Sequence, residues 1–201
     1  MKVPSMTAVL SRPATPRRVL FLDLGRLSVF LFGVLIVTGA LLALYYRPSP
    51  EGAFESLVTI TNSVRFGWFV RSMHRVAGQA FVALVGLYVL RGFFKRLYLG
   101  PRGAAAWRIS VAFAFVGLAF LITGESLPWS QSAYWQTVVN ANLIGEIPLV
   151  GHRLADALRG GPQVSGLTIV RLYALHALLL PWLAFGLLVL ARDLRKRGEL
   201  A

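Results

Sequence analysis

The segment LYALHALLLPWLAFGLLVLA, residues 172–191, has no charged residue over 20 positions and holds one histidine, His176. A helix of about 20 apolar residues is long enough to cross the hydrocarbon core of a bilayer. Three more stretches qualify or nearly qualify: residues 27–46, residues 76–90 with an apolar approach from Phe66, and residues 109–124, which continue apolar to Trp129. The sequence therefore predicts an all-α membrane protein, folded as an antiparallel transmembrane bundle of four helices.

The composition agrees with a bilayer as the solvent. Of the 201 residues, 56% are hydrophobic and 14% are charged, and the mean hydropathy is +0.65. A soluble domain carries about 25% charged residues. The absence of cysteine excludes thioether-linked haem, cysteine-ligated iron–sulfur clusters and disulfides. No hydrophobic stretch followed by a cleavage site precedes the first span, so we expect that span to act as its own insertion signal.

The net charge of +13 is distributed unevenly along the chain. Basic residues gather at alternate ends of the predicted spans: Lys2, Arg12, Arg17, Arg18 and Arg26, then Arg91, Lys95, Arg96, Arg102 and Arg108, then Arg192, Arg195, Lys196 and Arg197. The other two connections are poorer in Lys and Arg and hold five of the eight acids. By the positive-inside rule this predicts a four-pass protein of the cell (inner) membrane with both termini cytoplasmic. The same placement argues for membrane lipid, and against nucleic acid, as the partner of the charge.

The chain divides into three expected parts. These are a cytoplasmic N-terminal segment (1–19), a four-helix transmembrane domain (20–195) and a basic cytoplasmic tail (196–201). Residues 100–103, GPRG, predict the inner turn, with the third helix beginning near Trp107. Residues 130–165 form the longest connection, on the outer side. Its apolar residues Trp135, Val138, Val139 and Leu143 predict a short helix lying on the membrane surface.

Two of the three histidines, His74 and His176, lie in predicted spans. Both spans run from outside to inside, and both histidines sit near the outer end at similar depth. Diagonal helices of a four-helix bundle place two such imidazoles face to face across the axis. A flat haem fits between them, so both histidines are candidate iron ligands.

Four further residues suit a haem at this depth. Gly39 and Gly124 lie on the other two spans, where a small residue lets the ring approach the backbone. Arg71 and Arg171 precede the histidines and can pair with haem propionates. Taken alone, each residue has a simpler interpretation, because an intramembrane histidine can be a structural hydrogen-bonding group, an arginine can snorkel and a glycine can be a packing contact. The prediction depends on the combination.

These residues carry a family resemblance. The motifs in chain order are Gly67-Trp68, Arg71, His74, Gly78 and Arg91; then GESLPWSQ at 124–131; then Ile147-Pro148, Gly151 and Gly160-Gly161; then Leu167-Thr168, Arg171, Ala174, Leu175-His176 and Pro181. Together they resemble the N-terminal four-helix half of cytochrome b, the core subunit of bc-type quinol–cytochrome c reductases and their photosynthetic counterparts. The similarity covers roughly residues 20–195.

The resemblance implies that His74 and His176 hold an outer b haem lined by Gly39, Gly124, Arg71 and Arg171. That family places a second histidine pair 14 or 15 residues further along the same helices. Here Tyr88, Leu190 and Ala191 occupy those positions, and Ser110 replaces one of the two inner glycines while Gly25 keeps the other. We therefore expect one haem b and no inner haem. A tyrosinate ligand at Tyr88 remains the alternative to a core aromatic that fills the space.

By resemblance, the chain is a redox subunit of a quinol-oxidising complex rather than a complete enzyme. Its expected partners are the second half of cytochrome b, a cytochrome c or iron–sulfur protein, and quinol at a shared site. The alternative is a structural or assembly subunit that keeps the scaffold without redox turnover. Glu125 stands where the family has an aromatic residue, and His152 lies in the outer loop. Both have ordinary surface interpretations, with proton transfer near a quinol as the alternative.

Overall fold

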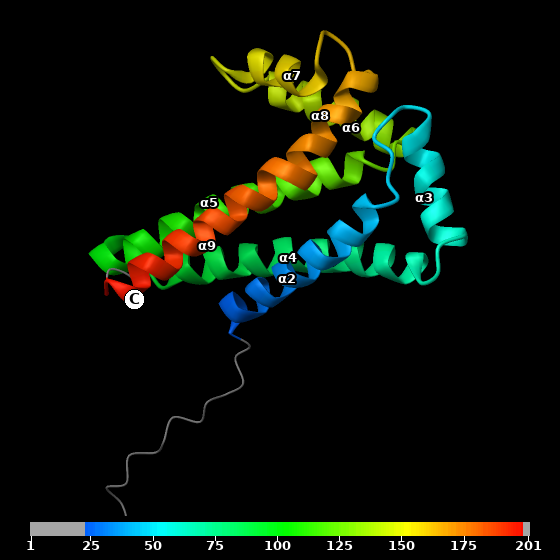
Figure 1. Cartoon of the computed structure of the whole chain (residues 1–201). Coiled ribbons are helices and arrows are strands. Elements are labelled where there is room, and N and C mark those ends of the chain that lie inside the picture. The colour runs from blue at the N-terminus through cyan, green and yellow to red at the C-terminus, as the bar shows by residue number, and fades with distance from the viewer. Residues whose placement is uncertain (1–22, 199–201) are drawn as a thin grey trace, which may run out of the picture.

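The computed structural model describes residues 23–198 (Figure 1). The expected N-terminal segment 1–19, and residues 199–201 of the expected tail, lie outside this range. Within it the chain is helical, with the elements α2 (Leu24–Ala43), α3 (Gly52–Asn62), α4 (Gly67–Phe94), η1 (Leu97–Leu99), α5 (Pro101–Ser126), α6 (Gln131–Gly145), α7 (Gly151–Arg159), α8 (Gly166–Ala174), η2 (Leu175–Leu179) and α9 (Leu180–Lys196).

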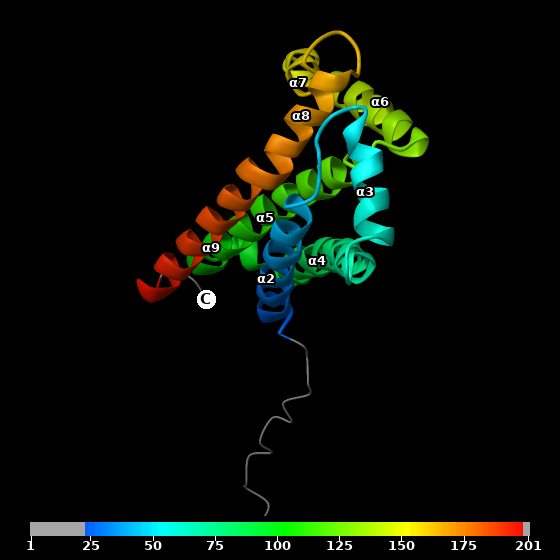
Figure 2. The ribbon, with the colours of Figure 1, turned by 45° about the vertical axis from the view of Figure 1, so that its right-hand side comes forward.

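Four helices of the described chain are long and apolar enough to cross a membrane: α2, α4, α5 and the continuous helix α8–η2–α9. In space α2 packs on α4, α4 on α5, and α5 on α9, so α4 and α9 occupy diagonal corners (Figures 1 and 2). The predicted all-α membrane fold with four spans is confirmed.

The core of the bundle is aromatic and lies between the two histidines and the end of the bundle near the C-terminus, which the sequence predicts to be the inner end. Phe32 of α2 and Phe81 of α4 are almost fully buried, with ring centroids 6.0 Å apart, and Phe113 of α5 lies 6.2 Å from Phe81. Val85 and Ala184 complete this buried cluster. Because its members come from all four spans, the cluster joins them below the level of the histidines.

The fourth span contains one wide turn. Residues 175–179 form a π-helical turn, in which the Leu180 N–H donates to the Leu175 carbonyl. Pro181 follows directly, and a proline inside a helix has no N–H to donate and clashes with the carbonyl four residues earlier. A π-turn accommodates both problems without ending the helix, and such turns are frequent at functional sites. His176 lies inside this turn.

The outer end is covered by α3, α6 and α7, which gather at the end of the bundle opposite the C-terminus (Figure 2). The predicted surface helix is present as α6, with Trp135, Val139 and Leu143 exposed along it. The second helix of this connection, α7, was not expected. It ends at Gly160, which has a left-handed φ of 82°.

The inner turn was predicted wrongly. The sequence placed it at residues 100–103 with the next helix from Trp107, whereas α5 already begins at Pro101. Proline suits the first turn of a helix, where its missing N–H has no partner to lose. The turn is therefore made by residues 95–100, where Arg96 has a left-handed φ of 54°.

One hydrogen bond ties the outer ends of two spans together. The Tyr46 hydroxyl, just beyond the spanning segment Leu24–Ala43, donates to the Leu127 carbonyl at 2.6 Å, and its ring lies 5.4 Å from that of Tyr173. Burial raises the pKa of Tyr46, so the hydroxyl keeps its proton and acts as a donor.

We expect Tyr46→Phe to lower the free energy of unfolding by about 1 kcal/mol, because it removes one partly buried hydrogen bond. Thermal unfolding in detergent measures the change. Tyr45→Phe is the matched control, since the Tyr45 side chain is 53% exposed. Equal melting temperatures for the two variants would contradict the role given to this bond.

Candidate functional site

His74 and His176 face each other across the bundle. His74 lies in the second turn of α4 and His176 lies in the π-turn of the diagonal span. Their ring centroids are 6.3 Å apart, with 65° between the ring planes. The two imidazoles thus come together, although they are separated by more than 100 residues in the chain.

The spacing of the rings suits a shared metal ion. A bond of about 2 Å from each imidazole nitrogen to the metal, plus the half-width of each ring, gives about 6 Å between ring centres. In the described residues no group of three or more His, Cys, Asp or Glu side chains converges on one point. The donor set that these residues offer is therefore two imidazoles. Such a set fits a metal whose remaining positions are filled by a flat macrocycle, which is the ligation of a b-type haem.

Each imidazole is held by a threonine that the sequence analysis did not single out. Thr38 Oγ1 lies 2.9 Å from His74 Nδ1, and Thr123 Oγ1 lies 2.9 Å from His176 Nδ1. Both threonines are buried, with 6% and 5% of their surface exposed. The available signal was a repeated dipeptide, because Thr-Gly occurs at 38–39 and again at 123–124, next to the predicted glycines.

The two glycines lie directly against the imidazoles. A Cβ at Gly39 would be 3.1 Å from Cε1 of His74, and a Cβ at Gly124 would be only 2.7 Å from Cε1 of His176. A methyl group at the second position has no room unless the ring moves. From the sequence we expected these glycines to leave space for a macrocycle, whereas in the structure they leave space for the two imidazoles.

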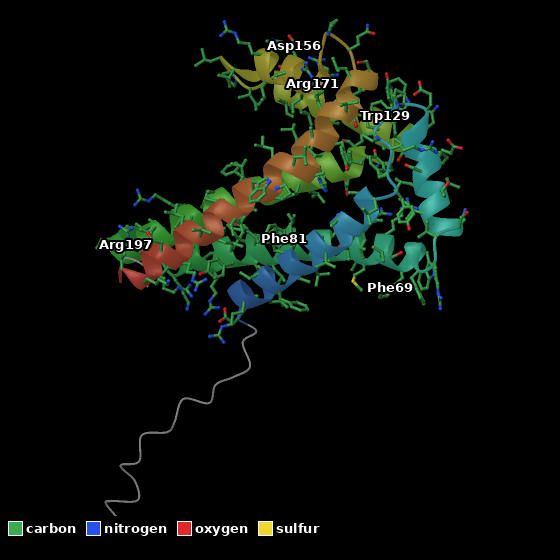
Figure 3. All side chains as sticks on the ribbon, in the orientation of Figure 1. Phe69, Phe81, Trp129, Asp156, Arg171 and Arg197 are labelled. Carbon is green, nitrogen blue, oxygen red and sulfur yellow. The ribbon has the colours of Figure 1, made fainter. Side chains whose placement is uncertain are left out.

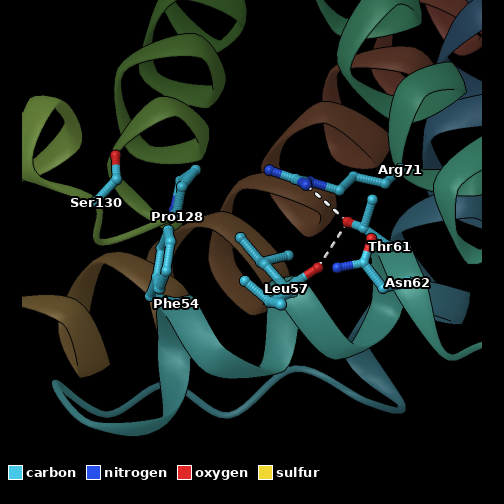
Figure 4. A pocket seen from close by; sticks show the side chains of 8 residues that line it. Phe54, Leu57, Thr61, Asn62, Arg71, Pro128 and Ser130 are labelled. Carbon is cyan, nitrogen blue, oxygen red and sulfur yellow. Dashed lines mark hydrogen bonds between the residues drawn. The ribbon is translucent and has the colours of Figure 1, made fainter.

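The two arginines bond to the outer helices. Arg71 Nη1 donates to Thr61 Oγ1 of α3 at 2.7 Å, beside a cavity of about 270 Å³ that Leu57 and Pro128 help to line (Figure 4). Arg171 donates to the Ala157 carbonyl of α7, at the outer end of the molecule (Figure 3). The structure therefore brings the histidines and glycines together and directs both guanidinium groups to the outer segments.

The remaining candidates lie apart from the imidazoles. Glu125 accepts a hydrogen bond from Gln136 Nε2 at 2.9 Å, which links α5 to α6. His152 is an exposed residue of α7. Tyr88 lies at the inner end of α4, where a Cβ at Gly25 would be 3.6 Å from its ring.

A family model and the similar proteins of known name all indicate a cytochrome b. The family model described as cytochrome b/b6/petB matches residues 9–194. A cytochrome b6 of Heliobacterium mobile is 38% identical over 170 residues, covering 85% of this chain and 79% of the relative. A cytochrome b6 of Crocosphaera subtropica is 35% identical over 192 residues, covering 94% and 86%.

A solved structure of a hyperthermophilic respiratory Complex III contains a chain of the same fold. It superposes with a TM-score of 0.77 at 27% identity and covers 85% of this chain. This chain covers 46% of that one, so it spans about half the length of its structural relative.

We expect alanine at either glycine to impair haem retention, and the shorter contact of the added Cβ with the imidazole to cause the larger loss. Gly124→Ala should lose most of the haem, because the added methyl group overlaps the His176 ring, and overpacking of this kind costs about 1–3 kcal/mol. Gly39→Ala should retain more, since its closest contact is longer. The haem-to-polypeptide ratio of the purified protein measures the effect.

Gly117→Ala is the control on the same helix as Gly124, because its Cβ would make ordinary contacts at 3.6 Å and 3.7 Å. Similar losses in all three variants would show that the glycines act on folding in general and not on the imidazoles.

Proposed function

The chain belongs to the cytochrome b/b6/petB family, and from this premise we propose that it is an electron-transfer subunit of a quinol-oxidising membrane complex, holding one b-type haem between His74 and His176 near the outer face. The observation that carries the proposal is the pair of imidazoles at 6.3 Å across the bundle axis. When bound, a haem would supply a reversible one-electron iron couple, and His74 and His176 would hold it.

The chain's own residues do three things in this proposal. The two histidines supply neutral nitrogen ligands from diagonal spans. Gly39 and Gly124 leave room for the imidazoles to adopt their position. The apolar spans exclude water around the site, and Phe120 stands edge-on to the His176 ring with centroids 5.4 Å apart. A dry, apolar shell of this kind tunes the redox potential of a bound iron.

Arg71 and Arg171 are proposed to neutralise the acidic side chains of the haem at its outer edge. Their position favours this, because Arg71 lies three residues and Arg171 five residues before its histidine, which is roughly one helical turn toward the outer face. Each guanidinium has several donors, so an acidic group can be bound in addition to, or in place of, Thr61 Oγ1 and the Ala157 carbonyl.

We further propose that the inner half of the bundle holds no haem. Leu190 and Ala191 have no ligating atom, and Ser110 stands where a clearance glycine is expected. The aromatic cluster of Phe32, Phe81 and Phe113 fills the bundle between the histidines and the inner end. Tyr88 lies beside Gly25, which supports its role as a side chain that takes up vacated space.

The partners follow from the family. We propose that the subunit shares its quinol site with the second half of cytochrome b, in line with its likeness to a chain of a respiratory Complex III. A cytochrome c or an iron–sulfur protein would accept the other electron. We place the subunit in the cell membrane with both termini cytoplasmic, on the charge asymmetry of its connections.

The second candidate, a structural or assembly subunit without redox turnover, is favoured by the loss of the inner ligands. The paired imidazoles count against it, because polar groups inside a bilayer are costly and are kept for function. Purified protein distinguishes the two, since sharp b-type absorption bands belong to the first and a colourless preparation to the second.

We expect His74→Ala and His176→Ala each to abolish the six-coordinate b-type spectrum of the reduced protein, because each removes one of the two residues that would hold the iron. His152→Ala, in exposed α7, should leave the spectrum unchanged. An intact six-coordinate haem in both of the first two variants would refute the ligand assignment.

We also expect one haem per polypeptide in the purified chain. The pyridine haemochrome assay against protein concentration measures this ratio. Tyr88→Phe should leave both the ratio and the spectrum unchanged if the tyrosine only fills space. A ratio of two, or a spectral change in that variant, would contradict an empty inner half.

A further inference from the structure

Thr38 and Thr123 make the same set of contacts on opposite sides of the bundle. Thr38 Oγ1 lies 2.7 Å from the Val34 carbonyl of its own helix and 2.9 Å from His74 Nδ1. Thr123 Oγ1 lies 2.6 Å from the Ala119 carbonyl and 2.9 Å from His176 Nδ1. Each hydroxyl thus bridges a backbone carbonyl four residues earlier and an imidazole on a neighbouring span.

The protons on these atoms can be assigned by elimination. A hydroxyl has one proton and a carbonyl oxygen has none, so an oxygen–oxygen contact of 2.6–2.7 Å requires that the threonine donate to its own helix. The threonine oxygen then has only lone pairs left for the imidazole. The imidazole nitrogen that faces it must therefore carry a proton, which makes Nδ1 the donor in both histidines.

This assignment sets the chemistry of the other ring nitrogen. A neutral imidazole protonated on Nδ1 has its lone pair on Nε2, and that nitrogen is then free to bind a metal ion. A hydrogen bond from Nδ1–H also increases the electron donation of Nε2, which favours the more highly charged oxidation state of the metal.

We propose that Thr38 and Thr123 are a matched pair of positioning residues that fix both imidazoles in the Nδ1–H tautomer and lower the potential of the iron they hold. The inference rests on the proposed haem ligation but goes beyond it. The two hydroxyl groups then have a function beyond the hydrogen bond that each makes within its own helix.

The test uses the full-length purified protein in three kinds of variant. Thr38→Val and Thr123→Val keep the shape of the side chain and remove the hydroxyl. Thr38→Ser and Thr123→Ser keep the hydroxyl and remove a methyl group. Thr137→Val is the matched control. Thr137 is 4% exposed, and its hydroxyl donates to the Ala133 carbonyl, four residues earlier, at 2.7 Å.

Spectroelectrochemical titration gives the midpoint potential, and the haem-to-polypeptide ratio gives retention. Loss of an outer-sphere partner of a ligand weakens metal binding by about 10–100-fold. If the affinity of the protein for the ferric haem falls tenfold and its affinity for the ferrous haem is unchanged, the midpoint potential rises by about 59 mV. We expect each valine variant to show this rise, or to lose haem outright, while the serine variants and Thr137→Val behave as the wild type.

The outcomes separate this inference from the proposed function. Valine and serine variants that all match the wild type would overturn it, as would serine variants that fail as badly as the valines or a Thr137→Val that shifts the potential equally. A wild-type protein that holds no haem would instead refute the proposed function itself.

Discussion

The hydrogen bond between an imidazole Nδ1 and a buried threonine hydroxyl is the interaction on which the site depends. The two imidazoles lie inside a largely apolar bundle. An unsatisfied polar group in such surroundings costs roughly several kcal/mol. Thr38 and Thr123 satisfy one nitrogen of each ring. In each ring the contact occupies Nδ1 and leaves Nε2 without a recorded protein partner among the described residues, and the two ring centroids lie 6.3 Å apart.

The site repeats one local design on both sides of the bundle. A Thr-Gly dipeptide near the outer end of one span supplies a hydroxyl and a bare backbone, and the histidine of the next span rests on both. The first pair joins α2 to α4 and the second joins α5 to the π-turn. Each histidine is thus fixed by a helix that precedes it in the chain.

Much of this arrangement follows from the sequence, for identifiable reasons. Uncharged runs reveal spans because charge inside a bilayer is costly, and counting residues along α4 and along α8 into η2 predicts similar depths for His74 and His176. The threonines were missed because their helix partners are local but their imidazole partners lie 36 and 53 residues away. The hydrogen-bond partner of Arg71 was not predictable either, because a long flexible side chain can reach several acceptors. That partner, Thr61, belongs to α3, and the position of α3 depends on the fold of the whole chain. The start of α5 at Pro101 was misjudged because proline both breaks and begins helices.

The wide turn at 175–179 changes how positions on the fourth span should be counted. A π-turn takes up one additional residue without a matching advance around the helix axis. Fifteen residues after His176 therefore correspond to about fourteen on a regular helix, which favours Ala191 over Leu190 as the position in line with the histidine. The burial pattern agrees, since Leu190 is 46% exposed and Ala191 is partly buried. By this count the position on the fourth span that corresponds to Tyr88 of α4 carries a single methyl group, so a large aromatic side chain on one span has a very small residue as its equivalent on the other.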